Sequence, residues 1–471
     1  MLARIATKEF TDTLRDGRFR WSAAIVITLL AAALGAGWKN YRDVKGQHDR
    51  AQTAMRDFWL NQPAKNPHSA AHYGVWAFKP RTLLSLVEQG VDPYVGVAAY
   101  LEAHKQNEFQ FRPAMDATAT QRFGQWTAAT ILQILLPLLI VVLAFPAFAG
   151  ERELGTLRQL VSLGVKPSVL AGGKALGVAA GLGVLLVPAT ILGVMALALA
   201  ASEGAFAVEM PRIGLMALTY LAYFVVFIAV SLVVSARARS SRVALLVLLA
   251  FWAVNSLVAP RVLSDVARRV APTPSAFQFI TALDADLKKG PDGHSPDVRT
   301  DSLRRTLLAK HRVSTVDSLP FNFDAVQMQQ AEEDGNIVFD RHYGALYSAY
   351  RRQNIVHQLG AVVAPLLAVR ALSMGLAGTD VEHHRAFADA SEAYRRMLIK
   401  KMNGSMAENS RSGDFSYKAD PSLWKEVPPF TYEQPPLVLS MGMQLPSLWL
   451  LLAWVVIGLV SVVRTRKLNL D

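Results

Sequence analysis

Residues 151–174 read E-R-E-L-G-T-L-R-Q-L-V-S-L-G-V-K-P-S-V-L-A-G-G-K, a charged stretch punctuated by glycine that lies between two long apolar runs. The runs cover residues 128–149 and 175–201 and contain no Asp, Glu, Lys, Arg or His. Each is long enough to cross a membrane as a helix, because about 20 apolar residues span the hydrocarbon core. We therefore expect residues 150–174 to form a surface turn, to which another protein can bind.

The composition of the whole chain is that of a membrane protein. Hydrophobic residues make up 52% of the chain and charged residues 18%, whereas soluble domains have about 25% charged residues. Six runs reach or approach spanning length: 22–37, 128–149, 175–201, 213–235, 243–259 and 445–463. The sequence predicts an all-α membrane protein with six transmembrane helices and two mainly helical external domains, at residues 38–127 and 260–444.

Basic residues cluster at every second boundary of these runs. Lys and Arg in short flanks stay in the cytoplasm, so the clusters indicate the orientation. They are Arg4, Lys8, Arg15, Arg18 and Arg20; Arg152, Arg158, Lys166 and Lys174; Arg237, Arg239 and Arg242; and Arg464, Arg466 and Lys467. We expect the leader 1–21, the loop 150–174 and the tail 464–471 in the cytoplasm, and the two long segments outside.

Residues 359–378 form a shorter apolar stretch that could be read as a seventh span. Arg370 near its middle and Pro365 inside it are both unfavourable in a lipid-facing helix. A seventh span would also place the last basic cluster outside, against the orientation rule. We therefore expect a helix that lies on the outer face of the membrane or packs in the external domain.

The external segments carry several helix signals. Asp92-Pro93 is a typical helix start and predicts a helix from residue 92 toward residue 106. The Thr379-x-x-Glu382 spacing is that of a capping box and predicts a helix over 386–402. Further helices are expected at 297–311 and 323–358, and the proline-rich residues 403–436 predict an extended strap. The chain has no cysteine, so these domains must be held by packing alone.

The leader has the pattern of an amphipathic helix. Its apolar residues Leu2, Ala6, Phe10 and Leu14 recur at every fourth position, and charged residues take the other side. Such a helix would lie in the inner membrane interface ahead of the first span, like an elbow. The alternative is a solvated, frayed end of the chain.

The predicted spans contain almost no side chains that could act in catalysis or carry ions. Besides hydroxyl residues and Trp, their polar residues are Gln133 and Asn255, which argues against transport driven by an ion gradient through these helices. The stretch Gly172-Gly173-Lys174-Ala175 lacks the spacing and hydroxyl of a phosphate-binding loop, so ATP would have to be hydrolysed by another subunit. His68 and His72, and the adjacent His383 and His384, are expected to be ordinary histidines, and no metal site is predicted.

The stretch after the second run resembles the cytoplasmic loop of ABC-2 type transporter permeases. The resemblance rests on Glu151-Arg152-Glu153-x-Gly155-Thr156, a short helix-forming stretch, and Gly173-Lys174 before the next run. In that family the loop forms a coupling helix that docks on an ATPase subunit, and an elbow helix precedes the first of six spans. The resemblance implies that the coupling residues are Glu151, Arg152, Glu153, Gly155, Thr156, Leu157, Arg158 and Leu160.

Within that family the chain is similar to a bacterial branch with large external insertions after the first and fifth spans. The residues that suggest it are His72-Tyr73-Gly74, Phe78-Lys79-Pro80, Leu101-Glu102-Ala103-His104, Gln106-Asn107, Leu376 to Asp380, His384, Phe387, Tyr394 and Arg395. The resemblance implies a multi-pass protein of the bacterial inner membrane that works with ATPase subunits, a second permease protomer (a copy or a paralogue) and membrane lipid. A periplasmic partner would suit the insertions, and nothing indicates nucleic acid. ATP and Mg would bind the partner subunit, and this chain would carry no cofactor.

The residues of the loop agree with a coupling role on physical grounds. Leu157, Leu160 and Leu163 recur at every third position, and Thr156 can cap a short helix that carries them. An apolar ridge flanked by charges suits a groove on a partner. We therefore expect a permease subunit of an ATP-driven exporter, without enzymatic activity of its own. The alternative is a scaffold or sensor that transports nothing and whose external part binds an envelope partner.

Overall fold

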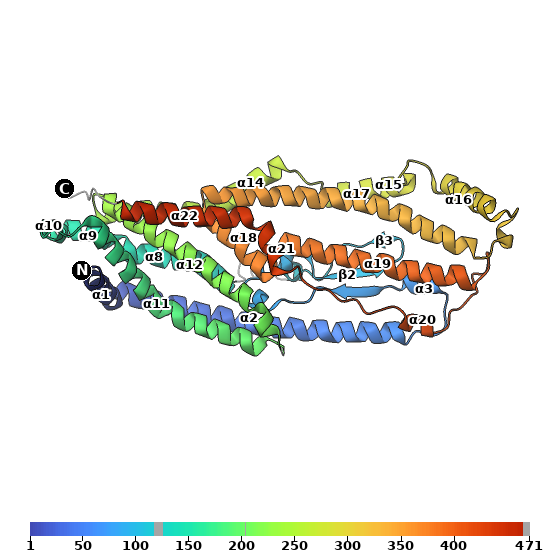
Figure 1. Ribbon diagram of the computed structural model, residues 1–471, viewed down its shortest axis with the longest axis horizontal. Helices are drawn as coiled ribbons and strands as arrows, with labels where there is room; N and C mark the ends of the chain where they lie inside the picture. Colours follow the sequence, from blue (N-terminus) through green and yellow to red (C-terminus); the bar gives the residue numbers. More distant parts are fainter. Residues whose placement is uncertain (117–125, 203, 465–471) are drawn as a thin grey trace.

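The computed structural model describes residues 1–116, 126–202 and 204–464. Six helical stretches in these residues are long and apolar enough to cross a membrane: Gly17–Leu60, Ala128–Glu153, Pro167–Ala200, Ala205–Arg237, Ser241–Val270 and Leu445–Val463. Figure 1 shows these stretches gathered at one end of an elongated molecule, with the first continuing toward the other end. The expected class, an all-α membrane protein with six spans, is confirmed. Arg466, Lys467 and the rest of the tail after Arg464 lie outside the described residues.

The spanning bundle contains both long and interrupted helices. Its elements are α1 (Leu2–Arg15), α2 (Gly17–Leu60), α7 (Ala128–Thr130), η2 (Ile131–Leu135), α8 (Leu136–Ala144), α9 (Pro146–Glu153), α10 (Thr156–Ser162), α11 (Pro167–Ala200), α12 (Ala205–Arg237), α13 (Ser241–Ala253), η3 (Val254–Val258), α14 (Ala259–Val270), α21 (Leu437–Met443) and α22 (Leu445–Val463). The turns η2 and η3 are π-helical. They widen the second and fifth spans locally, and such bulges are frequent at functional positions.

The first span continues far beyond the expected residues 22–37. Helix α2 has 44 residues, which corresponds to about 66 Å, roughly twice the thickness of the hydrocarbon core. Its far part carries charged pairs such as Lys39 and Asp43, whose Nζ and Oδ2 atoms are 2.6 Å apart. Near its end Trp59 packs on Trp424, with ring centroids 5.8 Å apart. One continuous helix therefore connects the bundle to the domain beyond it.

Helix α1 lies along the first half of α11, at the same end of the molecule as α10 (Figure 1). The contact is close because glycines of α11 face it. A Cβ atom built on Gly173 would lie 2.6 Å from Ile5 Cγ2, and one on Gly177 would lie 2.4 Å from Glu9 Cβ. These glycines therefore allow two helices to approach closely.

The amphipathic helix expected in the leader is present as α1. Of the residues expected on its apolar face, Ala6, Phe10 and Leu14 are half-buried and Leu2 is exposed. Thr13 also faces α11, beside Gly181. The side of α1 that meets the bundle is thus rotated slightly from the expected stripe, because Glu9 and Thr13 occupy part of the contact.

Residues 359–378 contribute a helix, α18 (Pro365–Ala377), that is buried inside the bundle. It packs against α12 and α22. The carbonyl oxygen of Ala361, just before it, accepts a hydrogen bond from Trp454 Nε1 at 2.8 Å, halfway along α22. Figure 1 shows the helices before and after it, α17 and α19, both running to the far end, so α18 enters the bundle without crossing it. The expectation of a surface-lying or externally packed helix is wrong, because neighbouring spans bury its apolar side chains.

A second inserted segment, η1 (Leu83–Leu86), enters the bundle from the first external segment. Its leucines are buried in the same core as the spans. The carbonyl oxygen of Leu86 lies 2.3 Å from where a Cβ atom on Gly37 would be. Only glycine at position 37 of α2 therefore leaves room for this backbone.

The part of the chain beyond the bundle, which we call the distal domain, comprises residues 45–82, 90–116, 271–359 and 379–436. Its elements are α3 (Pro67–His72), β1 (Val75–Phe78), α4 (Asp92–Val95), β2 (Ala98–Glu102), β3 (Lys105–Gln106), α5 (Pro113–Asp116), α15 (Ala276–Lys289), α16 (Pro296–His311), η4 (Val316–Ser318), α17 (Phe323–Leu359), α19 (Val381–Asn409) and α20 (Ser422–Lys425). The turn η5 (Gly360–Val362) follows α17 at the entry to the bundle. The segments that follow the first and fifth spans share one core, in which Trp59 and Ala99 lie with Phe387 and Trp424.

A small antiparallel sheet of order β1-β2-β3 replaces the helix expected over 92–106. The helix that begins at Asp92 ends at Val95, because Gly96 has a φ of 87° and turns the chain. Val75 then pairs with Leu101, and Leu101 with Gln106. The small side chains of Ala98 and Ala99 are fully buried under the rest of the domain, so tertiary packing overrides their local helix preference.

The helices expected at 297–311 and 323–358 are confirmed as α16 and α17. Helix α19 differs at both ends from the expectation. Its N-cap is Asp380, whose Oδ1 accepts from His383 N at 2.8 Å, so the cap expected from Thr379 is wrong by one position. At the other end α19 continues to Asn409, and the extended strap begins at residue 410.

Candidate functional site

The chain between the second and third spans, residues 151–166, forms a compact turn at one end of the bundle, which we call the α9–α10 turn. Helix α9 ends at Glu153, and Gly155 and Gly164 bracket α10 with φ angles of 71° and 77°. Glycine is suited to both positions, because other residues rarely adopt left-handed angles. Gly155 is also the N-cap, and Thr156 instead donates its hydroxyl to Glu151 O at 3.1 Å. The cap expected at Thr156 is therefore wrong.

Arg152 and Glu153 connect this turn to the turn between the fourth and fifth spans. Arg152 donates from Nη1 to Ala238 O at 2.6 Å and from Nη2 to Ala236 O at 2.8 Å. Glu153 accepts from the backbone nitrogen and the hydroxyl of Ser241, at 2.8 and 2.6 Å. A movement of α9 would therefore be passed to the ends of α12 and α13.

Glu151 faces a buried cation. Lys174 Nζ lies 2.9 Å from Glu151 Oε1 and 2.5 Å from Glu9 Oε1, and it also lies over the Phe148 ring. The Lys174 side chain is 1% exposed, and two carboxylates offset the cost of burying its charge. This cluster joins α1, α9 and α11.

The leucines of the turn divide into buried and exposed ones. Leu157 is fully buried and Leu160 is half-buried, whereas Leu154 and Leu163 are 79% and 77% exposed. The predicted ridge of Leu157, Leu160 and Leu163 is therefore not one surface. The apolar surface open to a partner consists of Leu154 and Leu163, on either side of α10, with Arg158 exposed between them.

A buried hydrogen-bond network, which we call the polar junction, joins three spans to the inserted segments. Its members are Glu88, Gln133, Tyr220, Tyr223, Asn255 and Ser373. Gln133 Nε2 donates to Glu88 Oε2 and to Tyr220 Oη, both at 3.1 Å. The Tyr220 hydroxyl lies 2.8 Å from the Ser373 hydroxyl of α18. These bonds hold both inserted segments to the spans.

The π-helical turns supply the other half of the polar junction. The backbone carbonyl of Gln133 in η2 accepts from Tyr223 Oη at 3.1 Å. Asn255 in η3 donates from Nδ2 to the same hydroxyl at 2.9 Å, and its Oδ1 accepts from Leu366 N at 3.0 Å. A π-turn frees backbone groups for such bonds. The network therefore fixes the N-terminus of α18 as well as its middle.

Sequence reasoning identified only part of this network. Gln133 and Asn255 were visible as the amides in otherwise apolar spans. Glu88 and Ser373 were missed, because they come from segments that lie far away in the sequence. The signal that could have found them is the need of a buried amide for partners.

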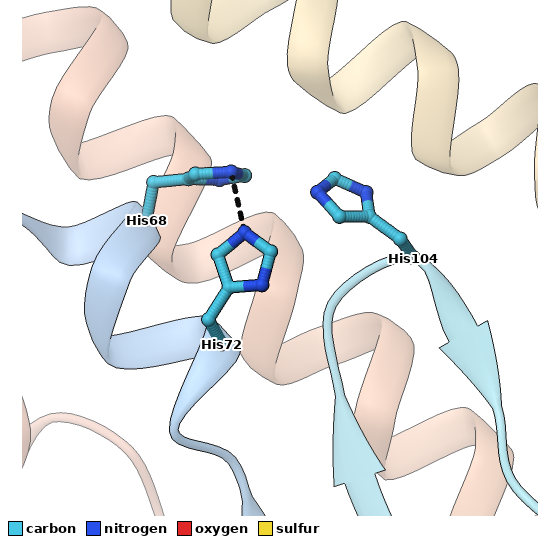
Figure 2. Close-up of side chains that lie close together, drawn as sticks. All are labelled: His68, His72 and His104. Atoms are coloured by element: carbon cyan, nitrogen blue, oxygen red, sulfur yellow. Dashed lines mark hydrogen bonds between the residues drawn. The ribbon is translucent and has the colours of Figure 1, made fainter.

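The histidines lie in two groups. His68 and His72 on α3 lie beside His104 in the β2–β3 turn (Figure 2). Burial lowers the pKa of both His68 and His72. His383 and His384 have separate structural surroundings: His383 bonds to Asp380 and Ser440, and His384 packs on Phe109. Burial lowers the pKa of His384 to about 4, so this ring stays neutral at ordinary pH.

An apolar cavity of about 320 Å³ opens between α2 and α11. Its lining is almost wholly hydrophobic and includes Leu34, Trp38, Leu185 and Met195. An apolar lining of this kind supplies almost no polar partners for a ligand.

Comparison with known families agrees with this architecture. Residues 3–288 match the family described as ABC-2 family transporter protein, over more than half of the chain. Residues 276–433 match a domain of unknown function, DUF3526, which covers α15 to the strap and includes the inserted helix α18. A search among curated proteins found no match. The chain therefore belongs to the ABC-2 transporter family, as a multi-pass permease subunit.

Proposed function

We propose that this chain is the permease subunit of an ATP-driven exporter in a bacterial inner membrane, with the α9–α10 turn in the cytoplasm. The orientation is supported by basic residues at two turns of one end, represented by Arg158 and Lys166 in one and Arg239 and Arg242 in the other. Arg152 and Glu153 join these two turns, so both lie on one side of the membrane. The distal domain would then lie in the periplasm.

The observation that carries the proposal is the exposed leucine pair on a rigidly held turn. Leu154 and Leu163 are largely exposed, while Arg152, Glu153 and Glu151 fix the base of the same turn to its neighbours. Apolar side chains on an ordered turn can enter a hydrophobic groove of a partner. We propose that an ATPase subunit binds here, with Leu154 and Leu163 as contacts and the three charged residues as positioning residues.

Force from the ATPase would then reach the rest of the molecule through fixed contacts. Closure of the ATPase pair would displace α9, and with it α12 and α13 through Arg152 and Glu153. The second span continues through α8 to η2, where Gln133 meets the inserted segments. Because α18 is packed in the bundle, the distal domain would move with the bundle. This movement would open or close a path between two permease protomers.

The test is to purify the full chain with its ATPase subunits and to change the exposed leucines. The double variant Leu154→Ala/Leu163→Ala should lose at least about 10-fold of ATPase binding, since two apolar contacts of about 1–2 kcal/mol each are removed. Its unfolding should be unchanged, because both side chains are exposed. The measurements are ATPase co-purification and ATP hydrolysis in proteoliposomes.

A matched control is Leu439→Ala/Leu445→Ala, which removes two exposed leucines, 50% and 45% exposed, at the other end of the bundle. This control should bind ATPase subunits like the unchanged chain. The docking proposal fails if Leu154→Glu/Leu163→Glu still binds and couples the ATPase. The absence of any ATPase from the purified complex would favour the scaffold or sensor function.

A further inference from the structure

Three imidazoles converge on the surface of the distal domain, from elements that are distant in the sequence. One ring nitrogen from each of His68, His72 and His104 lies within 4.8 Å of the other two. The closest pair, His68 Nε2 and His72 Nε2, is 3.2 Å apart. Figure 2 shows the three rings facing a common point, with His104 reaching across from the β2–β3 turn.

The outer nitrogens of two rings have fixed oxygen partners. His104 Nδ1 lies 2.6 Å from Glu332 Oε1, and His68 Nδ1 lies 3.1 Å from Asn403 Oδ1. Asn403 uses its Nδ2 to donate to Gln329 Oε1 at 3.1 Å, so its oxygen is the acceptor for His68. In the neutral tautomer both rings therefore carry their proton on Nδ1 and present a lone pair at Nε2. A carboxylate or amide oxygen behind a ligating histidine is the usual support of a metal site.

The local fold holds the three rings in place. Asn66 caps α3 by accepting from His68 N at 2.9 Å, and Pro67 occupies the first turn, where proline favours a helix. Residues 67–72 therefore form a helix, and His68 and His72 share one face of it. His104 has a φ of 67°, and its backbone nitrogen donates to Glu332 at 2.7 Å.

Glu332 is itself held by a buried arginine. Its Oε2 lies 3.2 Å from Nη1 of Arg395, whose side chain is 1% exposed and also pairs with Glu392. The carboxylate behind His104 is thus held in one position by a buried arginine.

We propose that His68, His72 and His104 bind a divalent transition-metal ion, with Zn²⁺ as the best fit. Zn–N bonds of about 2.0–2.1 Å in a tetrahedral site place neighbouring nitrogens about 3.3 Å apart, close to the 3.2 Å between His68 and His72. His104 is exposed on the solvent side, so its ring can close onto the ion by a small rotation. Without metal, the hydrogen bond between His68 Nε2 and His72 Nε2 requires a proton on one of these nitrogens. The bound ion would replace that proton.

The site leaves the fourth position of the metal open to water or to a ligand from outside, as in zinc sites with three protein ligands. The bound ion joins α3 to the β2–β3 turn, and through Glu332 to α17. It would therefore stiffen the contact between the two external segments. The inference concerns the distal domain alone, and it does not depend on whether the α9–α10 turn binds an ATPase.

The test uses the full chain in detergent, purified without a polyhistidine tag and stripped with a chelator. After Zn²⁺ is added back and the excess is removed by dialysis, we expect elemental analysis to find about one Zn²⁺ per chain. His72→Ala and His104→Ala should each weaken binding at least about 100-fold in a competition with a coloured chelator, because two remaining imidazoles hold the ion poorly. Bound Co²⁺ should show the intense visible bands of a tetrahedral ion.

His294→Ala is the matched control, since His294 is an exposed histidine of the loop between α15 and α16. It should bind Zn²⁺ like the unchanged chain. His72 is exposed, so metal-free His72→Ala should melt at the temperature of the metal-free parent, which shows that it folds. His104→Ala also removes the partner of the buried Glu332, so a lower melting temperature is expected for this variant. The proposal is overturned if His72→Ala and His104→Ala both retain Zn²⁺, if the unchanged chain binds none, or if Co²⁺ gives only the weak bands of an octahedral ion.

Discussion

Lys174 lies in the bundle and Arg395 in the distal domain, and each is a buried cation between two carboxylates. Lys174 contacts Glu9 and Glu151 in the bundle, and Arg395 contacts Glu332 and Glu392 in the distal domain. The two cations are equally buried, but their partners are not. The side chains around Lys174 are each 14% exposed, whereas those around Arg395 are 3% and 10% exposed.

The difference in exposure of the carboxylates indicates that the two ion clusters have different roles. Arg395 is sealed further by Asn336 and by the carbonyl oxygen of Glu102. Burial acts to lower its pKa, but the hydrogen bonds and charges of Glu392 and Glu332 raise the pKa above its usual value. The distal cluster is thus a closed frame, whereas the carboxylates at the turn are somewhat more exposed, although Glu151 Oε2 itself is buried. Helices that must shift can separate at lower cost where water replaces the lost partners.

The largest effect is expected from Arg395→Met. The change leaves Glu332 and Glu392 buried without a cation, which costs about 3–5 kcal/mol in comparable pairs. The distal domain should unfold at a lower denaturant concentration and become sensitive to protease. Arg385→Met is the control, since Arg385 on the same helix is 33% exposed and pairs with the exposed Asp389; its effect should stay within about 1 kcal/mol. Equal effects of the two changes would contradict the closed frame.

Lys174→Met should have a smaller effect, of about 2 kcal/mol, because Glu9 and Glu151 are each 14% exposed and water can reach part of each side chain once the cation is lost. The chain has no cysteine, so Thr13→Cys/Gly181→Cys can report how closely α1 docks. A Cβ atom on Gly181 would lie 3.4 Å from Thr13 Cβ, near the ~3.8 Å of disulfides.

Oxidation should therefore cross-link α1 to α11 rapidly in the cysteine pair, and Lys174→Met should slow this reaction. Lys166→Met, a change of an exposed lysine just before α11, is the control and should leave the rate unchanged. An unchanged rate in Lys174→Met would mean that packing against the glycines holds α1 without the ion pairs.

The elements that sequence reasoning predicted are those with a strong local signal. The six spans, α1, α16 and α17 each follow from an unbroken apolar or amphipathic pattern. The sheet was missed because β1, β2 and β3 are short, and because Ala98 and Ala99 favour a helix unless a neighbouring strand and helix bury them. The burial of α18 depends on contacts with α12 and α22 that no local pattern records.

The candidate sites were predictable to different degrees. The position of the α9–α10 turn followed from its flanking spans, but the direction of each leucine depended on where Gly155 starts the helix. The histidine pair on α3 was visible as an i, i+4 spacing. His104 and Glu332 were not, because the third imidazole and its carboxylate come from a turn and a helix that only the folded domain brings together.

Gly177→Ala tests whether α1 docks by shape as well as by charge. The added Cβ would lie 2.4 Å from Glu9 Cβ, so α1 must move away, at a cost of about 1.5 kcal/mol. Gly183→Ala is the matched control in the same helix, since a Cβ there meets nothing within 4 Å. In the cysteine-pair assay only Gly177→Ala should slow the cross-link. A similar loss for both would point to a general effect on α11 instead.

The smallest effect is expected at the polar junction, between the two ends. Tyr220→Phe removes the hydroxyl that links Gln133 to Ser373, and a lost buried hydrogen bond costs about 1 kcal/mol. The apparent melting temperature should fall only slightly. If force passes through this contact, changes made in the distal domain should alter the rate of ATP hydrolysis less in Tyr220→Phe than in the unchanged chain. Tyr94→Phe, at a 63% exposed tyrosine, should change neither. If Tyr220→Phe lowers stability yet leaves the coupling between the distal domain and ATP hydrolysis intact, the junction only anchors α18, and force must reach the distal domain along α2.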